Sequence, residues 1–171
     1  MSAATIILLL VTLQRAAELV LARSNTRRLL ERGALEVAPG HYPIVVLLHA
    51  AWLGALWLYG RNQPVEAVAA SGYGLLQLAR LWIIATLGRR WTTRIIVLPG
   101  EPLVTAGPYR FVSHPNYMVV AAEIALLPLA LHLPLMAFTF SILNALVLVV
   151  RIRAEDRALA AFALPARAAS P

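Results

Sequence analysis

The stretch GPYRFVSHPNY at residues 107–117, followed by two apolar runs and then by RIRAEDRAL at residues 151–159, decides how this chain folds. The apolar runs, residues 115–131 and 133–150, are each near the length of about 20 residues that crosses a bilayer as a helix. Two such helices in sequence form a hairpin, which returns the polar stretches to one face of the membrane. We expect the two stretches to meet there as halves of one site.

The composition indicates an integral membrane protein. Of the 171 residues, 60% are hydrophobic and 13% are charged, which is too apolar for a soluble domain of this size. Apolar runs near spanning length occur at residues 5–21, 42–59, 65–87, 115–131 and 133–150. We therefore expect an all-α fold of five transmembrane helices in a single domain, residues 1–171.

The arginines predict the topology. All 15 basic residues are Arg, and they gather in the first connection, in the third connection and after residue 150. By the positive-inside rule the N-terminus is outside and the C-terminus is cytoplasmic, together with the loop that holds residues 107–117. This clustering explains the net charge of +7 better than nucleic-acid binding does.

Three local features sharpen the prediction for the C-terminal half. Pro128 and Pro134 bracket a tight outward turn between the last two helices. Ser113 is expected to cap the fourth helix, with Pro115 in its first turn, where a missing amide proton is harmless. RIRAED is expected on a short cytoplasmic helix after the hairpin, and the Ala/Pro-rich tail 161–171 is expected to be loosely ordered.

Polar residues lie at one depth inside several of the predicted helices. At about 1.5 Å per residue they lie roughly 9 to 12 Å from the cytoplasmic ends, with Glu18 slightly shallower; they are Gln14, His49, Arg80, Glu123 and Asn144. Polar groups facing lipid are costly, so the shared depth favours an inward-facing polar pocket. The alternative is interhelical pairing, for example of Glu18 or Glu123 with Arg80.

The chain resembles the isoprenylcysteine carboxyl methyltransferase family through LVTAGPYRFVSHPNY, residues 103–117, and RIRAED, residues 151–156, in that order across the hairpin. The specific part, a cofactor-binding signature, covers residues 88–159. The N-terminal part is similar to a bacterial branch, some members of which methylate phenolic or pyrone lipids made by type III polyketide synthases. The resemblance implies transfer of a methyl group from S-adenosyl-L-methionine to a lipophilic acceptor.

The resemblance also implies the site residues. Cofactor contacts fall on the backbone of Glu101, Pro102, Leu103 and Val104, on Tyr109, on His114, Pro115, Asn116 and Tyr117, and on Glu155. The substrate-orienting arginine falls on Arg151, and Asp156 replaces the second glutamate of many relatives with no change of charge. Arg94 stands where some members contact the cofactor with another polar residue. No metal ligand is implied.

The chemistry of these residues suits the cofactor, which carries a carboxylate, an ammonium group and a sulfonium. His114 and helix-start amides offer hydrogen-bond donors, Glu155 offers an acid, and the tyrosine rings tolerate a sulfonium. Arg151 and Glu155 lie one helical turn apart on one face, so one can point to the acceptor and the other to the cofactor. Each residue also has a structural alternative. His114 would only form hydrogen bonds at the start of the fourth helix, and Tyr109 and Tyr117 would be aromatic residues of the membrane interface. Arg151 would be only one of the positive charges that set the topology.

These features favour an S-adenosylmethionine-dependent O-methyltransferase in the bacterial inner membrane, acting from the cytoplasmic face on the carboxylate of an isoprenylcysteine-like or other lipophilic substrate. A carboxylate acceptor needs positioning more than acid–base help, whereas a phenol or enol needs a base, for which Glu123 and His49 are candidates. Rival readings are O-methylation of phenolic or pyrone polyketide lipids, methylation of a phospholipid amine, a membrane reductase, and a non-enzymatic scaffold or small transporter. No nucleic-acid partner is expected.

Overall fold

The computed structural model describes residues 1–162. Residues 161 and 162 still belong to the last helix, and the rest of the tail that was expected to be loosely ordered lies outside the described residues. The elements, in chain order, are α1 (Ala3–Glu31), β1 (Leu35–Glu36), the 3-10 turn η1 (Pro39–His41), α2 (Tyr42–Tyr59), α3 (Ala67–Leu87), η2 (Gly88–Arg90), β2 (Ile96–Val97), η3 (Gly107–Arg110), α4 (Pro115–Ala130) and α5 (Pro134–Phe162).

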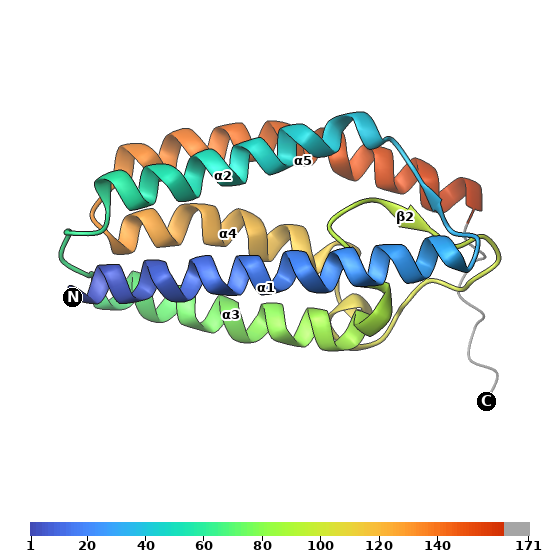
Figure 1. The fold of residues 1–171 in the computed structure, drawn as a ribbon, viewed down its shortest axis with the longest axis horizontal. Coiled ribbons are helices and arrows are strands. Elements are labelled where there is room, and N and C mark those ends of the chain that lie inside the picture. The colour runs from blue at the N-terminus through green and yellow to red at the C-terminus, as the bar shows by residue number, and fades with distance from the viewer. Residues whose placement is uncertain (163–171) are drawn as a thin grey trace.

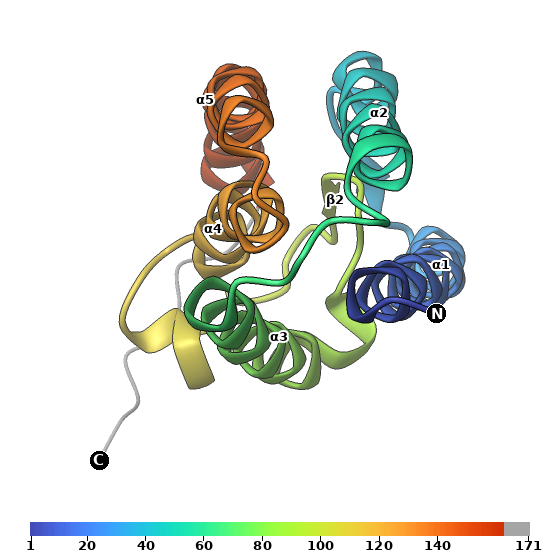
Figure 2. The same cartoon turned by 90° about the vertical axis from the view of Figure 1, so that its left-hand side faces the viewer.

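The five helices run side by side along one axis (Figure 1). Viewed along that axis they form a ring in the order α1, α2, α5, α4, α3 (Figure 2). One end of the bundle, the hairpin end, holds the turn between α4 and α5 and the link between α2 and α3. The other end, the loop end, holds residues 88–114 and the C-terminal turns of α1 and α5.

Four helices are long and apolar enough to cross a membrane, and α4 is a shorter apolar helix of 16 residues. Helices are the expected outcome of such runs, because backbone polar groups inside a bilayer must be satisfied within the segment. The protein is thus an all-helical integral membrane protein apart from a two-residue antiparallel pairing of β1 with β2. The count of five spans and their orientation stay predictions.

The hairpin end is closed by backbone bonds. The turn after α4 places His132 at a positive φ of 54° and bonds the Leu133 amide to the Pro128 carbonyl at 2.9 Å. The Glu66 amide bonds the Ala130 carbonyl at 2.8 Å, and the Glu66 carboxylate caps α3 by accepting from two backbone amides, which holds its pKa below the usual value. The predicted tight turn between α4 and α5 is confirmed, and its position outside the membrane stays a prediction.

Two predicted helix boundaries at the loop end are wrong. The first helix does not stop near residue 21 but continues to Glu31, and it ends where Gly33 adopts a φ of +87°, as glycines after helix ends commonly do. RIRAED lies within α5 itself and not on a separate short helix. Residues 151–162 contain no Gly or Pro and consist largely of good helix formers, so the helix has no reason to break.

The start of α4 also differs from the prediction. Pro115 occupies the first turn as expected, but the N-cap is His114, and no side chain caps this helix end. Ser113 therefore lies one residue too early, and its predicted capping role is wrong. The Asn116 amide at this helix end is therefore not bonded to a capping side chain, whereas the Tyr117 amide bonds the His114 carbonyl at 3.2 Å.

A cluster of four charges ties α1, α3 and α4 together midway along the bundle. Glu123 accepts from Arg80 Nε at 2.9 Å, from Arg80 Nη2 and from Arg15 Nη2 at 2.9 Å. Glu18 accepts from Arg15 Nη1 at 2.7 Å and from Arg80 Nη1 at 3.3 Å. Gln77 adds a further bond to Glu123 at 2.8 Å. Two arginines and two glutamates cancel, so the cluster carries no net charge.

The structure shows interhelical pairing for Glu18, Arg80 and Glu123, and none of the three lines either of the two cavities, at the loop end or between α1 and α3. Arg15 and Gln77, which the depth argument did not single out, complete the cluster with Gln14. His49 instead bonds the Val45 carbonyl of its own helix at 2.8 Å. Gln14 and Gln77 also line a second cavity of about 320 Å³ between α1 and α3, which opens on the hairpin side of the cluster.

We expect Glu123→Gln to destabilise the protein by about 3 to 5 kcal/mol, because it leaves two buried arginines facing one carboxylate. Glu31→Gln is the matched control: its partner Arg27 and Glu31 itself are both exposed, and such pairs contribute less than about 1 kcal/mol. Unfolding in mixed detergent micelles measures both variants. Equal loss in the two variants would contradict a structural role for the cluster.

Candidate functional site

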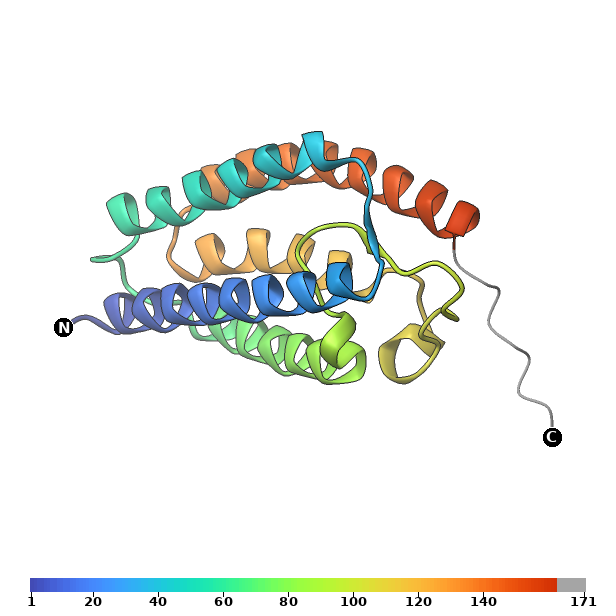
Figure 3. The same cartoon turned by 45° about the vertical axis from the view of Figure 1, so that its right-hand side comes forward.

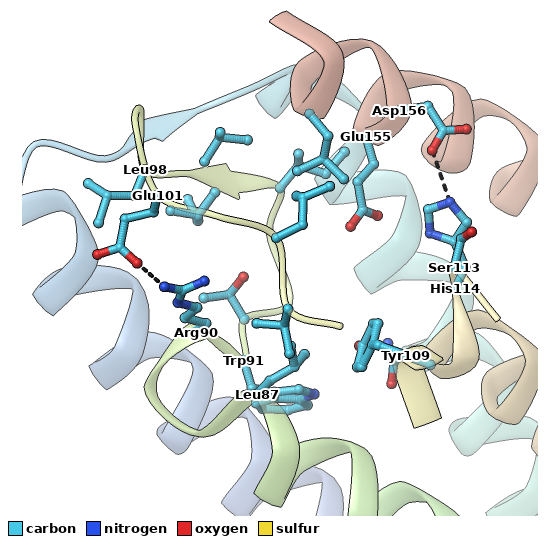
Figure 4. A pocket seen from close by; sticks show the side chains of 18 of the residues that line it. Leu87, Arg90, Trp91, Leu98, Glu101, Tyr109, Ser113, His114, Glu155 and Asp156 are labelled. Carbon is cyan, nitrogen blue, oxygen red and sulfur yellow. Dashed lines mark hydrogen bonds and ion pairs between the residues drawn. The ribbon is translucent and has the colours of Figure 1, made fainter. Parts of the chain in front are cut away.

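A cavity of about 480 Å³ opens at the loop end (Figure 4). Its wall comes from the ends of α1 and α3, from residues 90–105, from η3, from the start of α4 and from the extension of α5. Ten of the eleven predicted site residues line it: Glu101, Pro102, Leu103, Val104, Tyr109, His114, Asn116, Tyr117, Arg151 and Glu155. The eleventh, Pro115, is buried in the first turn of α4 beside the cavity.

The two sequence halves meet through Tyr117. Its hydroxyl donates to the Glu155 carboxylate and accepts from Arg151 Nε at 2.9 Å. The Arg151 guanidinium also lies 5.6 Å from the centre of the Tyr117 ring and donates from Nη2 to the Thr93 carbonyl at 2.6 Å. One phenol thus joins an arginine and a carboxylate that are a single helical turn apart.

His114 forms a second link between α4 and α5. Its Nε2 lies 2.9 Å from Asp156 Oδ1, and its ring stacks on Tyr117 with centroids 5.4 Å apart. Figure 4 shows His114 and Asp156 together at the rim, with Glu155 pointing from α5 into the cavity. Asp156 therefore orients the imidazole, a role that the sequence analysis did not assign to it.

The cavity arginines differ in their charge partners. Arg90 pairs with Glu101, and Arg94 pairs with Glu36 at 2.9 Å. That hydrogen-bonded carboxylate raises the pKa of Arg94, which also lies over the Tyr42 ring. Within residues 1–162, Arg151 has no carboxylate at ion-pair distance, although its side chain is only 7% exposed. Arg151 is thus a buried cation available to an anionic ligand.

The carboxylate of Glu101 is already occupied. It binds Arg32 at 2.6 Å and also Arg90, whose guanidinium further donates to the Pro102 carbonyl at 2.7 Å. These contacts fix residues 101–104 against the end of α1. What this segment offers the cavity is then mainly its backbone, which agrees with the role that the resemblance implied.

The turn η3 depends on Gly107. This residue has a φ of +56°, and a Cβ added to it would lie 2.4 Å from Thr86 Oγ1 on α3. The close approach brings Tyr109 to the cavity wall, where burial raises the pKa of its phenol, with a smaller contribution from the charge of Glu155. The conformation of the turn and its packing on α3 therefore both require glycine.

Two contributors lay outside the sequence prediction. Trp91 is buried and lines the cavity with an indole N–H that has no partner within the described residues. Thr93 acts through its backbone carbonyl, which no side-chain pattern reveals. Asn25 holds this segment by donating to the Trp91 carbonyl at 2.8 Å.

A model of the isoprenylcysteine carboxyl methyltransferase (ICMT) family matches residues 71–161, which include the hairpin and most of the cavity wall. This chain belongs to the ICMT family. The resemblance seen in residues 103–117 and 151–156 is thereby confirmed, and the protein is a member of a family of membrane methyltransferases.

Two bacterial proteins are similar to this chain over most of its length. The uncharacterized protein YpbQ of Bacillus subtilis (strain 168) is 39% identical over 163 residues, covering 90% of this chain and 95% of its own. An uncharacterized protein of Haemophilus influenzae (strain ATCC 51907 / DSM 11121 / KW20 / Rd) is 25% identical over 141 residues, covering 79% and 82%. No solved structure gives a significant match to this chain.

We expect Gly107→Ala to displace η3, because the added methyl group meets Thr86 and the backbone conformation disfavours a side chain. The expected destabilisation is about 1 to 3 kcal/mol, measured by thermal unfolding in detergent. Adding Thr86→Ala should recover part of the loss. Gly40→Ala, where a methyl group meets open space, is the control, and an equal effect there would contradict the packing argument.

Proposed function

We propose that the protein is an integral-membrane O-methyltransferase that uses S-adenosyl-L-methionine and methylates a lipophilic acceptor bearing an anionic oxygen. The observation that carries this proposal is the Arg151–Tyr117–Glu155 contact in the loop-end cavity. It presents a buried positive group and a carboxylate, one turn apart, to the same space. A ligand with a negative group and a ligand with a positive group can therefore be held side by side.

The residues of the cavity fit the cofactor. A cavity of about 480 Å³ lies within the range of roughly 300 to 1,000 Å³ typical of small-molecule sites. Glu155 would bind the ammonium group or the ribose hydroxyls, and His114 with the uncapped amide of Asn116 at the start of α4 would bind the carboxylate. The Tyr109 and Tyr117 rings would face the sulfonium. When bound, the cofactor supplies the methyl group.

Arg151 would hold the acceptor. A guanidinium offers a planar pair of donors that matches a carboxylate, and Arg151 still has donors beyond those bonded to Tyr117 and Thr93. Methylation of a carboxylate forms one C–O bond and breaks one S–C bond, and no proton needs to move. The work of the protein is then to position the two reactants and exclude water.

The buried polar residues favour this acceptor over a phenol or an enol, which would need a base. Glu123, one of the two candidate bases, is held by Arg80, Arg15 and Gln77 and lies outside the wall of the cavity. His49 lies outside that wall as well. We therefore prefer the carboxylate of an isoprenylcysteine-like or similar lipid, with phenolic and pyrone lipids as the alternative.

The first prediction from the proposed function concerns cofactor binding. Purified protein in nanodiscs should bind S-adenosylmethionine or its demethylated product, and Glu155→Gln should weaken binding by about 1 to 3 kcal/mol through loss of a charge-assisted hydrogen bond. Titration calorimetry measures both. Arg153→Ala is the matched control, because Arg153 is exposed on the same helix. Absence of binding at millimolar cofactor would remove the methyltransferase proposal.

A second prediction separates the acceptor from the cofactor. Arg151→Ala should abolish methylation of an anionic lipid while leaving cofactor affinity within a few-fold, since Arg151 contacts the acceptor in this scheme. Arg151→Lys should rescue little, because a point charge does not reproduce a two-pronged contact. If Arg151→Ala loses cofactor affinity and turnover equally, the arginine serves the cofactor instead.

A third prediction tests orientation. The clusters of Arg at the loop end support a cytoplasmic active site in the bacterial inner membrane. Reporter fusions after Gly40 and after Arg94 should therefore report cytoplasm, and a fusion after Asn62 should report the outside. The reverse pattern would separate the cavity from cytosolic cofactor and exclude the proposed arrangement.

A further inference from the structure

The loop that carries the site has a second, apolar face that points away from it. Phe111 is 72% exposed and Val112 is 37% exposed, directly after η3. Figures 2 and 3 show this turn outside the ring of helices, beside the loop ends of α3 and α4. The neighbouring Met118 on α4 is also exposed, at 61%. An apolar surface at this position needs a partner or a lipid environment.

The depth of the turn is set by its contact with α3. Gly107 packs on Thr86, which belongs to the last turn of a helix that is long and apolar enough to span the membrane. Trp82 lies one turn further into the same helix and is exposed as well, as is usual for tryptophan near a membrane surface. The turn therefore packs beside the end of the apolar segment of α3.

The backbone of the turn suits that location. The amides of Phe111 and Val112 both bond the Pro108 carbonyl, at 3.2 and 3.3 Å, and the Tyr109 amide bonds the Ala106 carbonyl at 3.1 Å. Backbone groups that bond internally tolerate contact with lipid, whereas open ones do not. Arg110 lies over the Phe111 ring at 5.5 Å, where its charge can reach lipid phosphate groups while the ring enters the apolar layer.

We infer that residues 110–112 form an interfacial contact with the bilayer, in which Phe111 and Val112 enter the boundary of the acyl chains and Arg110 binds phosphate groups of phospholipids. The inferred partner is the membrane lipid itself. Tyr109, on the other face of the same turn, lines the cavity. Lipid contact on one side therefore holds the cavity wall on the other, and this coupling rests on the function proposed above.

The chain contains no cysteine, so single-cysteine labelling has no background. Phe111→Cys, labelled with a nitroxide in phosphatidylethanolamine/phosphatidylglycerol vesicles, is compared with two reference positions. Leu146→Cys, exposed in the middle of α5, marks the lipid, and Arg157→Cys, exposed on its charged extension, marks water. Collision rates with oxygen and with a water-soluble nickel chelate measure the depth.

A label at residue 111 that is closer in depth to the Leu146 reference than to the Arg157 reference supports the inference. A label closer to the Arg157 reference overturns it. This measurement needs no cofactor, so its outcome is independent of the proposed activity. Thermal unfolding of the labelled protein shows that the substitution leaves the fold intact, and Met118→Cys repeats the depth measurement on the adjoining helix surface.

The coupling to the cavity has its own test. In nanodiscs, Phe111→Ser should weaken cofactor binding several-fold, whereas Phe111→Leu, which keeps an apolar group at the membrane boundary, should leave it unchanged. Equal effects of the two variants would overturn the coupling. If wild-type protein binds no cofactor, the proposed function fails while the depth measurement still decides the lipid contact.

Discussion

Charge compensation inside an apolar bundle is the constraint on which the rest of this structure depends. A charge in contact with lipid is expensive, so the polar groups between the helices must satisfy one another. Midway along the bundle the charged groups do so, because Arg15 and Arg80 cancel Glu18 and Glu123 across three helices. This neutral cluster closes the bundle below the cavity and leaves the loop end as the place where charge can remain available.

At the loop end, some arginines have a carboxylate partner, but Arg151 has none within the described residues. Arg90 and Arg94 have glutamate partners, and these pairs hold loops in place. Arg151 has only a phenol and a backbone carbonyl. The contrast separates arginines paired with a carboxylate in the wall from Arg151, which has none within residues 1–162, a distinction that the number of arginines in the sequence does not make.

Much of this architecture could be predicted from the sequence, for physical reasons. Long apolar runs admit little besides helices in a bilayer, and prolines on either side of a short segment marked the turn between α4 and α5. The spacing of GPYRFVSHPNY and RIRAED, with the family resemblance, located the cavity, because a hairpin returns its two ends to one side. These predictions rest on local pattern and on chain connectivity.

The remainder depended on contacts between distant residues. Pairing of Arg15 with Glu123 and capture of Glu101 by Arg32 join positions whose proximity no local pattern encodes. The pattern of side chains could not predict that the backbone carbonyl of Thr93 accepts a hydrogen bond from Arg151. The shared depth of polar residues correctly predicted a layer. It could not predict that Arg80 and Glu123 pair with each other while Gln14 lines a cavity, because depth along a helix does not tell whether two groups face each other or a void.

The unbroken course of α5 has a geometric consequence. Since Arg151 and Glu155 belong to one continuous helix, their separation along its axis is fixed at about 6 Å by the helical rise, and they cannot approach or separate independently. The opposite wall, the segment of residues 98–105 and η3, is instead held by ion pairs of Glu101 and by the contact of Gly107 with Thr86. One side of the cavity thus has a spacing that the helix itself sets, and the other side has a shape that depends on contacts between segments far apart in the sequence.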